Sequence, residues 1–285
     1  MTYLQLYRDV RARLVGAAIE AAACEALLII EHYCGLAKTE LLVHGDERVV
    51  TSAEAEAVLS AVRRRARHYP LQYILGKWQF MDLTLLVGEG VLIPREDTEV
   101  LVNAAAAALG CGNGLYGVDL CAGTGAVGLS LSRLCPGVRI TAVELHSAAY
   151  DYLTKNISRY PKCMVQPLRG DVLSPELARC FDRLDFIVSN PPYIASCELP
   201  ELQAEVRLEP QTALSGGSDG LDFYRAIAKL WVPRLKAGGI IALETGDTQA
   251  AQVIRLLEGA GTTGCTIHKD FSGLDRVITG IKHAL

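Results

Sequence analysis

Strand-like and helix-like segments alternate through the second half of the chain, and this alternation constrains the fold more than any other feature. The strand-like runs are short and mostly apolar, and they lie at residues 116–120, 138–145, 163–168, 184–190 and 239–245. The stretches between them are long enough for crossover helices, so the pattern predicts a doubly wound, mostly parallel α/β sheet. Residues 265–282 read as two strands around a turn at Ser272 and Gly273, which would close the sheet with an antiparallel strand.

The first 75 residues carry a pattern typical of helices instead. Apolar side chains recur at intervals of three and four between residues 4 and 34, and Gly35 supplies a stop. Thr51 precedes Glu54 by three residues, the capping-box spacing at the start of a helix. Residues 1–75 are therefore predicted to form a small helical bundle.

Residues 76–93 connect the two patterns. Apolar residues partly alternate there, and Gly88, Glu89 and Gly90 interrupt the alternation in a way that suits the turn of a hairpin. We expect a helical domain over residues 1–75, a hairpin linker over 76–93 and an α/β domain over 94–285.

Composition narrows the class of protein. Half of the 285 residues are hydrophobic and 21% are charged, which indicates a globular chain. The net charge of -4, with no basic, aromatic-rich segment, argues against a dedicated nucleic-acid-binding surface. The nine cysteines are scattered without a CxxC pair, so we expect reduced thiols and no metal site. No run suits a signal peptide or a membrane span, and the expected location is the cytoplasm.

Residues 117–128 combine a buried-type strand, a glycine-rich turn and the start of a helix. Gly123, Gly125 and Gly128 permit a tight turn and a close approach of backbone to ligand. This spacing suits both a dinucleotide and S-adenosylmethionine, and a purely structural turn is a further alternative.

Three acidic residues help to decide whether the loop binds a dinucleotide, binds S-adenosylmethionine or is only a structural turn. Glu144 ends the next strand, about 20 residues beyond Gly125, where a carboxylate can accept hydrogen bonds from both ribose hydroxyls of an adenosine. Asp119 favours S-adenosylmethionine, because it would pair with a methionine ammonium and repel a pyrophosphate; its alternative is an acid near the N-terminus of the following helix. Asp171 would accept from an adenine amine, with Val172 packing on the ring, or else it belongs to a turn or caps the helix near Ser174.

The fourth strand ends in Ser189-Asn190-Pro191-Pro192-Tyr193. Because ligands of open parallel sheets bind at the carboxyl ends of the strands, this segment should lie beside the glycine-rich loop. Two consecutive prolines hold their carbonyl acceptors stiffly, and Asn190 adds a side-chain acceptor.

Such acceptors fit a substrate NH2 group on a planar, conjugated system, whose nitrogen is a poor nucleophile. They would direct this nitrogen at the sulfonium methyl of S-adenosylmethionine, and catalysis would depend on positioning and placed dipoles. Tyr193 would form a wall of the pocket. Asn-Pro-Pro-Tyr alone is also an ordinary turn, and its place after an apolar strand favours the catalytic interpretation.

At this point the sequence resembles the HemK-type peptide chain release factor glutamine N5-methyltransferases, a family of class I methyltransferases. The resemblance covers nearly the whole chain and is carried by PLQYILG at residues 70–76, IPREDTE at 93–99, DLCAGTGA at 119–126, SNPPYI at 189–194 and VRLEPQTAL at 206–214. Because enzymes that methylate adenine or guanine amines share Asn-Pro-Pro-Tyr, IPREDTE and RLEPQTAL are the discriminating pieces.

The resemblance implies a Rossmann-like class I methyltransferase domain preceded by a small N-terminal helical bundle. It implies methyl transfer from S-adenosylmethionine to the glutamine amide of the Gly-Gly-Gln loop of release factors, with S-adenosylhomocysteine as product. The helical part and the hairpin would help to grip the release factor, and we expect a monomer.

Carried over by position, the resemblance also implies site residues. Contacts to the cofactor would come from Cys121, Ala122, Gly123, Thr124, Gly125, Glu144, Val172 and Asn190. The glutamine would be held by Asn190, Pro191, Pro192 and Tyr193. The chain departs from the family at Cys121, where a glycine is usual, and at Val172, where an aromatic residue is common.

Other residues have open roles. Arg95 is expected to shape the substrate entrance, and Asp97 to cap the helix that follows it. The arginines at residues 63–67 favour a solvated helix face over a contact with RNA or an acidic protein. Glu244 ends the fifth strand near the expected site, and a structural role is equally open.

Two other functions compete with methylation of a release factor. A methyltransferase for an exocyclic amine of adenine or guanine in RNA or DNA would use the same Asn190 chemistry, but the acidic charge argues against it. A protein that only binds adenosyl ligands would not need the intact segment from Asn190 to Tyr193.

Overall fold

The computed structural model describes residues 1–110, 112 and 114–283, and the chain divides into two units. The first comprises Met1–Lys77 together with Gln203–Leu208, and the second comprises Trp78–Leu202 and Glu209–Leu285. The short segment Gln203–Leu208 therefore belongs to the N-terminal unit, although the chain on both sides of it belongs to the other.

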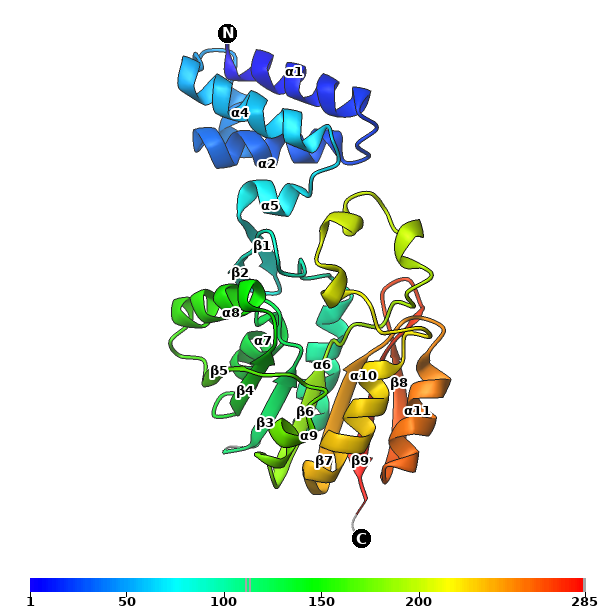
Figure 1. The fold of residues 1–285 in the computed structure, drawn as a ribbon. Helices are drawn as coiled ribbons and strands as arrows, with labels where there is room; N and C mark the ends of the chain where they lie inside the picture. Colours follow the sequence, from blue (N-terminus) through cyan, green and yellow to red (C-terminus); the bar gives the residue numbers. More distant parts are fainter. Residues whose placement is uncertain (111, 113, 284–285) are drawn as a thin grey trace. The chain divides into compact units, whose positions relative to one another are not determined.

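The N-terminal unit is helical, as predicted. Its helices, labelled in Figure 1 except for α3, are α1 (Tyr3–Gly16), α2 (Ala22–Cys34), α3 (Lys38–His44), α4 (Ser52–Arg65) and α5 (Leu71–Leu75). Thr51 and Glu54 form the expected capping box, and Gly35 ends α2 in the left-handed conformation with φ 64°. These local signals are confirmed.

One arginine of the basic run at residues 63–67 is buried in this unit. Arg65 is buried; it donates to both carboxylate oxygens of Glu25 and, over 2.7 Å, to Glu205 of the Gln203–Leu208 segment. The prediction of a solvated face is wrong at this position, because two carboxylates from distant parts of the sequence neutralise the guanidinium. The neighbouring Arg63 and Arg64 are exposed.

The second unit contains a seven-stranded sheet in the order β5-β4-β3-β6-β7-β9-β8. Its strands are β3 (Tyr116–Leu120), β4 (Arg139–Glu144), β5 (Val165–Arg169), β6 (Leu184–Ser189), β7 (Leu235–Glu244), β8 (Thr262–Lys269) and β9 (Asp275–Lys282). The first five strands in this order are parallel, whereas β9 is antiparallel to both of its neighbours. The predicted fold class, including the antiparallel final strand, is confirmed.

Helices cover both faces of the sheet (Figure 1). On one face α6 (Thr98–Leu109), α7 (Ala126–Leu134) and α8 (Ser147–Arg159) bury an apolar core against the strands. On the other, α9 (Pro175–Arg179), α10 (Asp222–Ala226), the π-helical turn Ile227–Trp231 and α11 (Ala250–Gly259) bury a second core. Short 3-10 turns lie at Leu199–Glu201, Val206–Leu208, Gln211–Ala213 and Val232–Arg234. Because the central strands β3 and β6 are buried, the carboxyl edge of the sheet is the place left for the site.

The expected hairpin exists, but its turn is elsewhere. The strands β1 (Lys77–Phe80) and β2 (Leu83–Leu86) are joined at Met81 and Asp82, with Met81 at φ 49°. Gly88 and Gly90 come after the hairpin, and α8 explains them: a Cβ on Gly88 would lie 2.0 Å from the Tyr152 hydroxyl, and one on Gly90 2.6 Å from Ala148 Cβ. The glycines permit close packing rather than a hairpin turn.

The eight described cysteines are free thiols, and Cys111 lies outside the described residues. Within residues 1–110, 112 and 114–283, no group of His, Cys, Asp and Glu side chains could hold a metal ion. No helix in this part of the chain is long and apolar enough to cross a membrane.

Candidate active site

The site forms where the strand order reverses. The central strand β3 has β4 on one side and β6 on the other, so the loops after β3 and β6 emerge next to each other at the carboxyl edge. The last residues of these strands, Leu120 and Ser189, are paired, and the Ser189 hydroxyl donates to the Leu120 carbonyl over 2.6 Å. The glycine-rich loop and Asn190 therefore start from one fixed point.

A pocket opens at this edge of the sheet. The predicted site residues that line it are Arg95, Asp119, Cys121, Ala122, Gly123, Thr124, Glu144, Asp171, Val172, Asn190 and Pro192. Gly125, Pro191 and Tyr193 lie next to lining residues in the sequence but do not line the pocket themselves.

The glycine-rich loop keeps its tight turn despite Cys121. This residue adopts φ 60°, the left-handed conformation that favours glycine, as do Gly123 at φ 54° and Gly125 at φ 83°. The Gly125 amide closes the turn by donating to the Ala122 carbonyl over 2.7 Å, and Gly125 then caps α7. The departure from the family pattern thus places an L-residue in a strained conformation that glycine adopts freely.

Glu144 holds the same loop from the neighbouring strand. One carboxylate oxygen accepts from the Gly123 amide over 2.9 Å, and the other accepts from the His146 amide over 2.8 Å. Since each oxygen has a second lone pair, the buried carboxylate keeps acceptor capacity toward the pocket that it lines.

Asp119 is buried in β3 with its carboxylate only partly satisfied. Oδ2 accepts from the Gly128 amide in the first turn of α7 over 2.9 Å, whereas Oδ1 is buried without a hydrogen-bond partner in the described part of the chain. Burial raises the pKa of Asp119 to about 7, the Gly128 hydrogen bond lowers it, and the Glu144 carboxylate raises it further. Asp119 thus contacts the N-terminus of α7, as its alternative role requires. Its other oxygen, Oδ1, remains available to a cationic ligand.

Asp171 and Val172 form another wall of the pocket. Asp171 Oδ1 accepts from the Leu173 amide over 2.8 Å, which is the turn interaction considered as an alternative. The helix α9 is capped by Ser174 and not by Asp171. Val172 is buried, and its carbonyl accepts from the Trp231 indole over 2.9 Å, so its position is firmly set.

Asn190 enters the pocket with a defined amide orientation. Its Nδ2 donates to the Thr98 hydroxyl over 3.1 Å, which leaves the carbonyl Oδ1 as the other end of the amide. Pro191 and Pro192 are buried, and the Tyr193 carbonyl accepts from the Gln249 side chain over 2.9 Å. Burial, followed by the nearby Glu244 carboxylate, raises the pKa of Tyr193, so this side chain stays neutral.

Arg95 is paired within the site. It forms an ion pair with Glu209, whose other oxygen accepts from the Ile93 amide over 2.9 Å. Glu209 is almost fully buried, and this contact fixes the segment that leads into α6. Arg95 therefore lines the pocket as a residue already held by a carboxylate.

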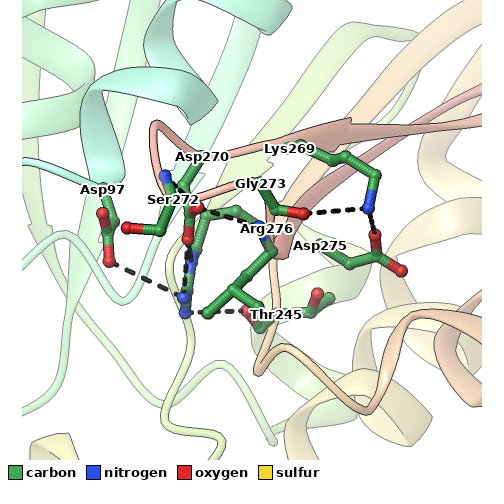
Figure 2. A network of polar contacts seen from close by, with 9 residues as sticks. Asp97, Thr245, Lys269, Asp270, Ser272, Gly273, Asp275 and Arg276 are labelled. Carbon is green, nitrogen blue, oxygen red and sulfur yellow. Dashed lines mark hydrogen bonds and ion pairs between the residues drawn. The ribbon is translucent and has the colours of Figure 1, made fainter.

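Asp97 does not cap α6 with its side chain. Its φ of -58° and ψ of -30° are already helical, and a capping side chain needs extended backbone to reach back to the helix amides. Instead its carboxylate lies 3.6 Å from the Arg276 guanidinium, which also binds Asp270 over 2.9 Å and reaches the Thr245 carbonyl (Figure 2). The guanidinium thereby ties the start of α6 to the turn between β8 and β9.

Some lining residues had no predicted role. Thr98 lines the pocket and stands in the IPREDTE segment, and Glu209, which binds the lining residue Arg95, stands in RLEPQTAL, so both segments carried a signal to which no function of these two residues was attached. Phe223 and His146 also line the pocket, and nothing local in the sequence marks Phe223, since its position depends on tertiary packing.

The pocket fits an adenosyl ligand that carries an ammonium group. Three features lie together at the strand ends: a buried acid with one oxygen that no described residue contacts by a hydrogen bond, a glycine-rich loop, and a neighbouring acid with spare acceptor capacity. A dinucleotide pyrophosphate would meet Asp119 with like charge.

Family models agree with this assignment. The PrmC N-terminal domain matches residues 5–76, and the methyltransferase small domain matches residues 96–206. The fold, the pocket and these matches together define an enzyme of the methyltransferase class.

Similar proteins show which family of methyltransferases this is. The chain is 36% identical over 278 residues to the release factor glutamine methyltransferase of Moorella thermoacetica, covering 97% of both chains. It is 32% identical to the solved protein-(glutamine-N5) methyltransferase (release factor-specific) of Alicyclobacillus acidocaldarius, with 70% of this chain and 99% of that chain covered and a TM-score of 0.44. The chain belongs to the release factor glutamine methyltransferase family.

The fold is shared more widely. A 16S rRNA N2 methyltransferase of T. thermophilus, solved with AdoMet and guanosine, is 23% identical, with a TM-score of 0.53 over 73% of this chain and 50% of that chain. This likeness concerns the fold alone.

Proposed function

We propose that the protein transfers a methyl group from S-adenosylmethionine to the side-chain amide nitrogen of the glutamine in the Gly-Gly-Gln motif of peptide chain release factors. The observation that carries the proposal is the Asn190 amide, which lines the pocket and commits its NH2 end to Thr98. A carbonyl oxygen so oriented matches a substrate that offers NH2 hydrogens. Relatives over nearly the whole chain carry the corresponding name.

Residues of the pocket have distinct roles in holding the cofactor. The loop from Cys121 to Gly125 gives the ligand a close approach, and Glu144 accepts from the ribose hydroxyls. Asp119 pairs with the methionine ammonium through Oδ1, the oxygen that has no hydrogen-bond partner among the described residues. Asp171 accepts from the adenine amine and Val172 packs against the ring.

Methyl transfer places few demands on acid–base chemistry. S-adenosylmethionine supplies a methyl group on positively charged sulfur. Asn190 Oδ1 and the Pro191 carbonyl accept the hydrogens of the glutamine NH2, and with Pro192 and Tyr193 they hold its nitrogen in line with that methyl. As the nitrogen–carbon bond forms, the carbon–sulfur bond breaks, S-adenosylhomocysteine leaves, and the methylated nitrogen loses one proton to water.

Peptide mass mapping of a purified release factor tests the proposal. After incubation with the protein and S-adenosylmethionine, the Gly-Gly-Gln peptide should gain one methyl group on its glutamine. A release factor with alanine in place of that glutamine, and the Asn190→Ala variant of the enzyme, serve as controls that should gain none at matched times. Unmethylated release factor, together with methylation of RNA or DNA amines by the same preparation, would replace the proposal by the nucleic-acid alternative.

The proposal also covers the roles of the domains, the oligomeric state and the cellular location. Residues 1–75 and the hairpin at 76–93 would grip the release factor, while residues 94–285 would perform the transfer. We further propose a monomeric, cytoplasmic enzyme. Light scattering of the purified protein tests the first point, and fractionation of cells that produce it tests the second.

A further inference from the structure

Gln249 contacts the end of the segment from Asn190 to Tyr193 without lining the pocket itself. It is half-buried and directly precedes α11, of which it is the N-cap residue. Its side chain makes no capping hydrogen bond to the helix, and glutamine is not among the residues preferred at this position. The start of α11 therefore does not explain this side chain, and its contacts with the neighbouring loops do.

The side-chain amide of Gln249 is used at both ends. Its oxygen Oε1 accepts from the Gly246 amide over 3.1 Å, within the turn that joins β7 to α11. Its nitrogen Nε2 donates to the Tyr193 carbonyl over 2.9 Å and, at the longer distance of 3.5 Å, to the Gly220 carbonyl. Because a backbone N–H can only donate and a carbonyl can only accept, these partners fix which end of the amide is which.

Two glycines make room for this amide. A Cβ on Gly220 would lie 2.3 Å from the Tyr193 carbonyl oxygen and 2.5 Å from Gln249 Nε2. A Cβ on Gly246 would lie 3.0 Å from Gln249 Oε1. Gly220 also adopts φ 74°, a conformation that favours glycine. The loops after β6, before α10 and after β7 thus come together at the Gln249 side chain.

The contact with Gln249 completes the hold on one peptide group. The N–H of the peptide between Tyr193 and Ile194 donates to the Leu214 carbonyl over 2.9 Å, and the carbonyl of the same peptide accepts from Gln249. Since a peptide group is planar, hydrogen bonds at its two ends fix the orientation of the plane. Without Gln249 the plane would lose one of these two contacts.

The prolines transmit this orientation to the pocket. The rings of Pro191 and Pro192 fix φ, and neither residue has an N–H to donate. The directions of their carbonyls therefore depend on how the two ends of the segment are held. At one end Ser189 is paired with β3, and at the other end Gln249 binds Tyr193.

We propose that Gln249 is a positioning residue for methyl transfer, which by holding the Tyr193 carbonyl directs the Pro191 carbonyl and Asn190 toward the acceptor NH2 group. The proposal rests on the proposed function, because it assumes that Asn190 and Pro191 receive a substrate NH2 group. Gln249 touches neither the cofactor nor the acceptor in this assignment, so it acts on the rate through Tyr193.

Two substitutions separate the contacts of Gln249. Gln249→Glu keeps an acceptor for the Gly246 amide but, at about pH 8, turns a carboxylate oxygen toward the Tyr193 carbonyl, acceptor against acceptor. Gln249→Met keeps the length of the side chain and removes both contacts. If the Tyr193 contact positions the segment, both variants are slow, whereas a loss in Gln249→Met alone would assign the effect to the Gly246 turn and overturn the proposal.

Kinetics of release-factor methylation measure the effect. In both variants kcat should fall by about tenfold or more, because a misplaced acceptor group costs alignment with the methyl group. The KM for the release factor and the Kd for S-adenosylmethionine should change less than about threefold, because the pocket walls remain. Rates are expressed per S-adenosylmethionine-binding site, so that unfolded protein is not counted as slow enzyme.

Gln252→Glu and Gln252→Met are the matched controls. Gln252 lies on α11, three residues after Gln249, and is exposed. The same chemical changes at this position should leave kcat within about twofold of the wild type. Equal losses at the two positions would overturn the proposal, as would a normal kcat in Gln249→Glu.

The Tyr193 carbonyl also gives a readout that needs no turnover. Tyrosine labelled with 13C at the carbonyl, combined with isoleucine labelled with 15N, selects Tyr-Ile peptide bonds in an NMR spectrum, and the chain has two of these, Tyr73-Ile74 and Tyr193-Ile194. The Tyr193 carbonyl signal should shift in both Gln249 variants and stay in place in both Gln252 variants. The Tyr73 signal is the internal reference, which none of these substitutions should move.

The two readouts distinguish the possible failures. An unmoved Tyr193 signal in both Gln249 variants would reject the positioning role even if the enzyme methylates release factors. If the wild type methylates nucleic-acid amines instead, the proposed function fails, and the same comparison of kcat with that acceptor decides whether Gln249 positions the segment.

Discussion

The hydroxyl of Ser189 donates to the carbonyl of Leu120 over 2.6 Å, and this buried contact joins the end of β6 to the end of β3. The glycine-rich loop begins one residue after Leu120, and Asn190 follows Ser189. This hydrogen bond adds to the parallel pairing of β3 with β6 in joining the side that would hold the methyl donor to the side that would hold the acceptor.

Ser189→Ala should lower both the stability of the protein and its rate of methyl transfer. Loss of the hydrogen bond costs about 1 kcal/mol, read from urea unfolding, and kcat should fall several-fold because the two loops lose their common anchor. Ser130→Ala is the matched control, since that hydroxyl is equally buried and has no partner in the described part of the chain. Equal effects of the two substitutions would argue against a special role for the Leu120 contact.

The backbone conformation at position 121 suits glycine better than an L-residue. An L-residue in the left-handed conformation is strained, so Cys121→Gly should be more stable than Cys121→Ala by about 1 kcal/mol. Both variants lose the thiol, so the comparison isolates the backbone at φ 60°. Denaturant midpoints measure the difference, and greater stability of the alanine variant would contradict the strain.

Glu144→Gln should weaken the binding of S-adenosylmethionine by about tenfold or more, as measured by calorimetry. The amide has a single acceptor oxygen, so it cannot serve the Gly123 and His146 amides and the ribose as the carboxylate does. Glu176→Gln, on the exposed surface of α9, is the control with the same chemical change. Unaltered affinity in Glu144→Gln would remove Glu144 from the ribose site.

Affinity for S-adenosylmethionine should fall in acid. The pKa of Asp119 is raised to about 7, and an ammonium ligand binds the carboxylate form, so binding lowers this pKa and releases a proton. Below pH 7 the protonated form dominates, and the Kd should rise toward about tenfold per pH unit. Above about pH 8 the ligand amine loses its charge, and affinity should fall again.

Asp119→Asn is the control for that pH dependence. Its side-chain oxygen can still accept from the Gly128 amide, while the titration of Asp119 is gone. The comparison separates Asp119 from the other titratable groups that line the pocket, namely Arg95, Cys121, Glu144, His146 and Asp171. The same acidic limb in both proteins would assign it to one of these groups.

Arg65→Ala should strongly destabilise the N-terminal unit. Removal of the guanidinium leaves the Glu25 carboxylate buried without its counter-ion, which costs about 3–5 kcal/mol. Arg63→Ala, on the same helix and exposed, should change stability by less than about 0.5 kcal/mol. Thermal unfolding compares the two, and a small effect at Arg65 would contradict the buried pair.

Features governed by local rules could be predicted from the sequence. The capping box at Thr51, the stop at Gly35 and the alternation of strands and helices depend on neighbouring residues, and the structure confirms them. The position of the glycine-rich loop and of Asn190 at one sheet edge follows from the same alternation.

Features governed by distant partners could not be predicted in this way. Gly88 and Gly90 resemble a turn, yet their role depends on α8. Asp97 resembles a cap until Arg276, from the last strand, is known to lie beside it. Arg65 belongs to a solvated-looking run, and only the fold supplies Glu25 and Glu205.

The segment Gln203–Leu208 makes the N-terminal unit discontinuous in sequence, because six residues of it are inserted between Leu202 and Glu209 of the other unit. A single recombination event near residue 77 therefore could not exchange the whole N-terminal unit, because residues 203–208 would stay with the other unit. A chain that starts at Trp78 would keep the inserted residues but lose Arg65, the arginine that holds Glu205. A change in the first 77 residues and a change in this insertion are thus expected to be selected together.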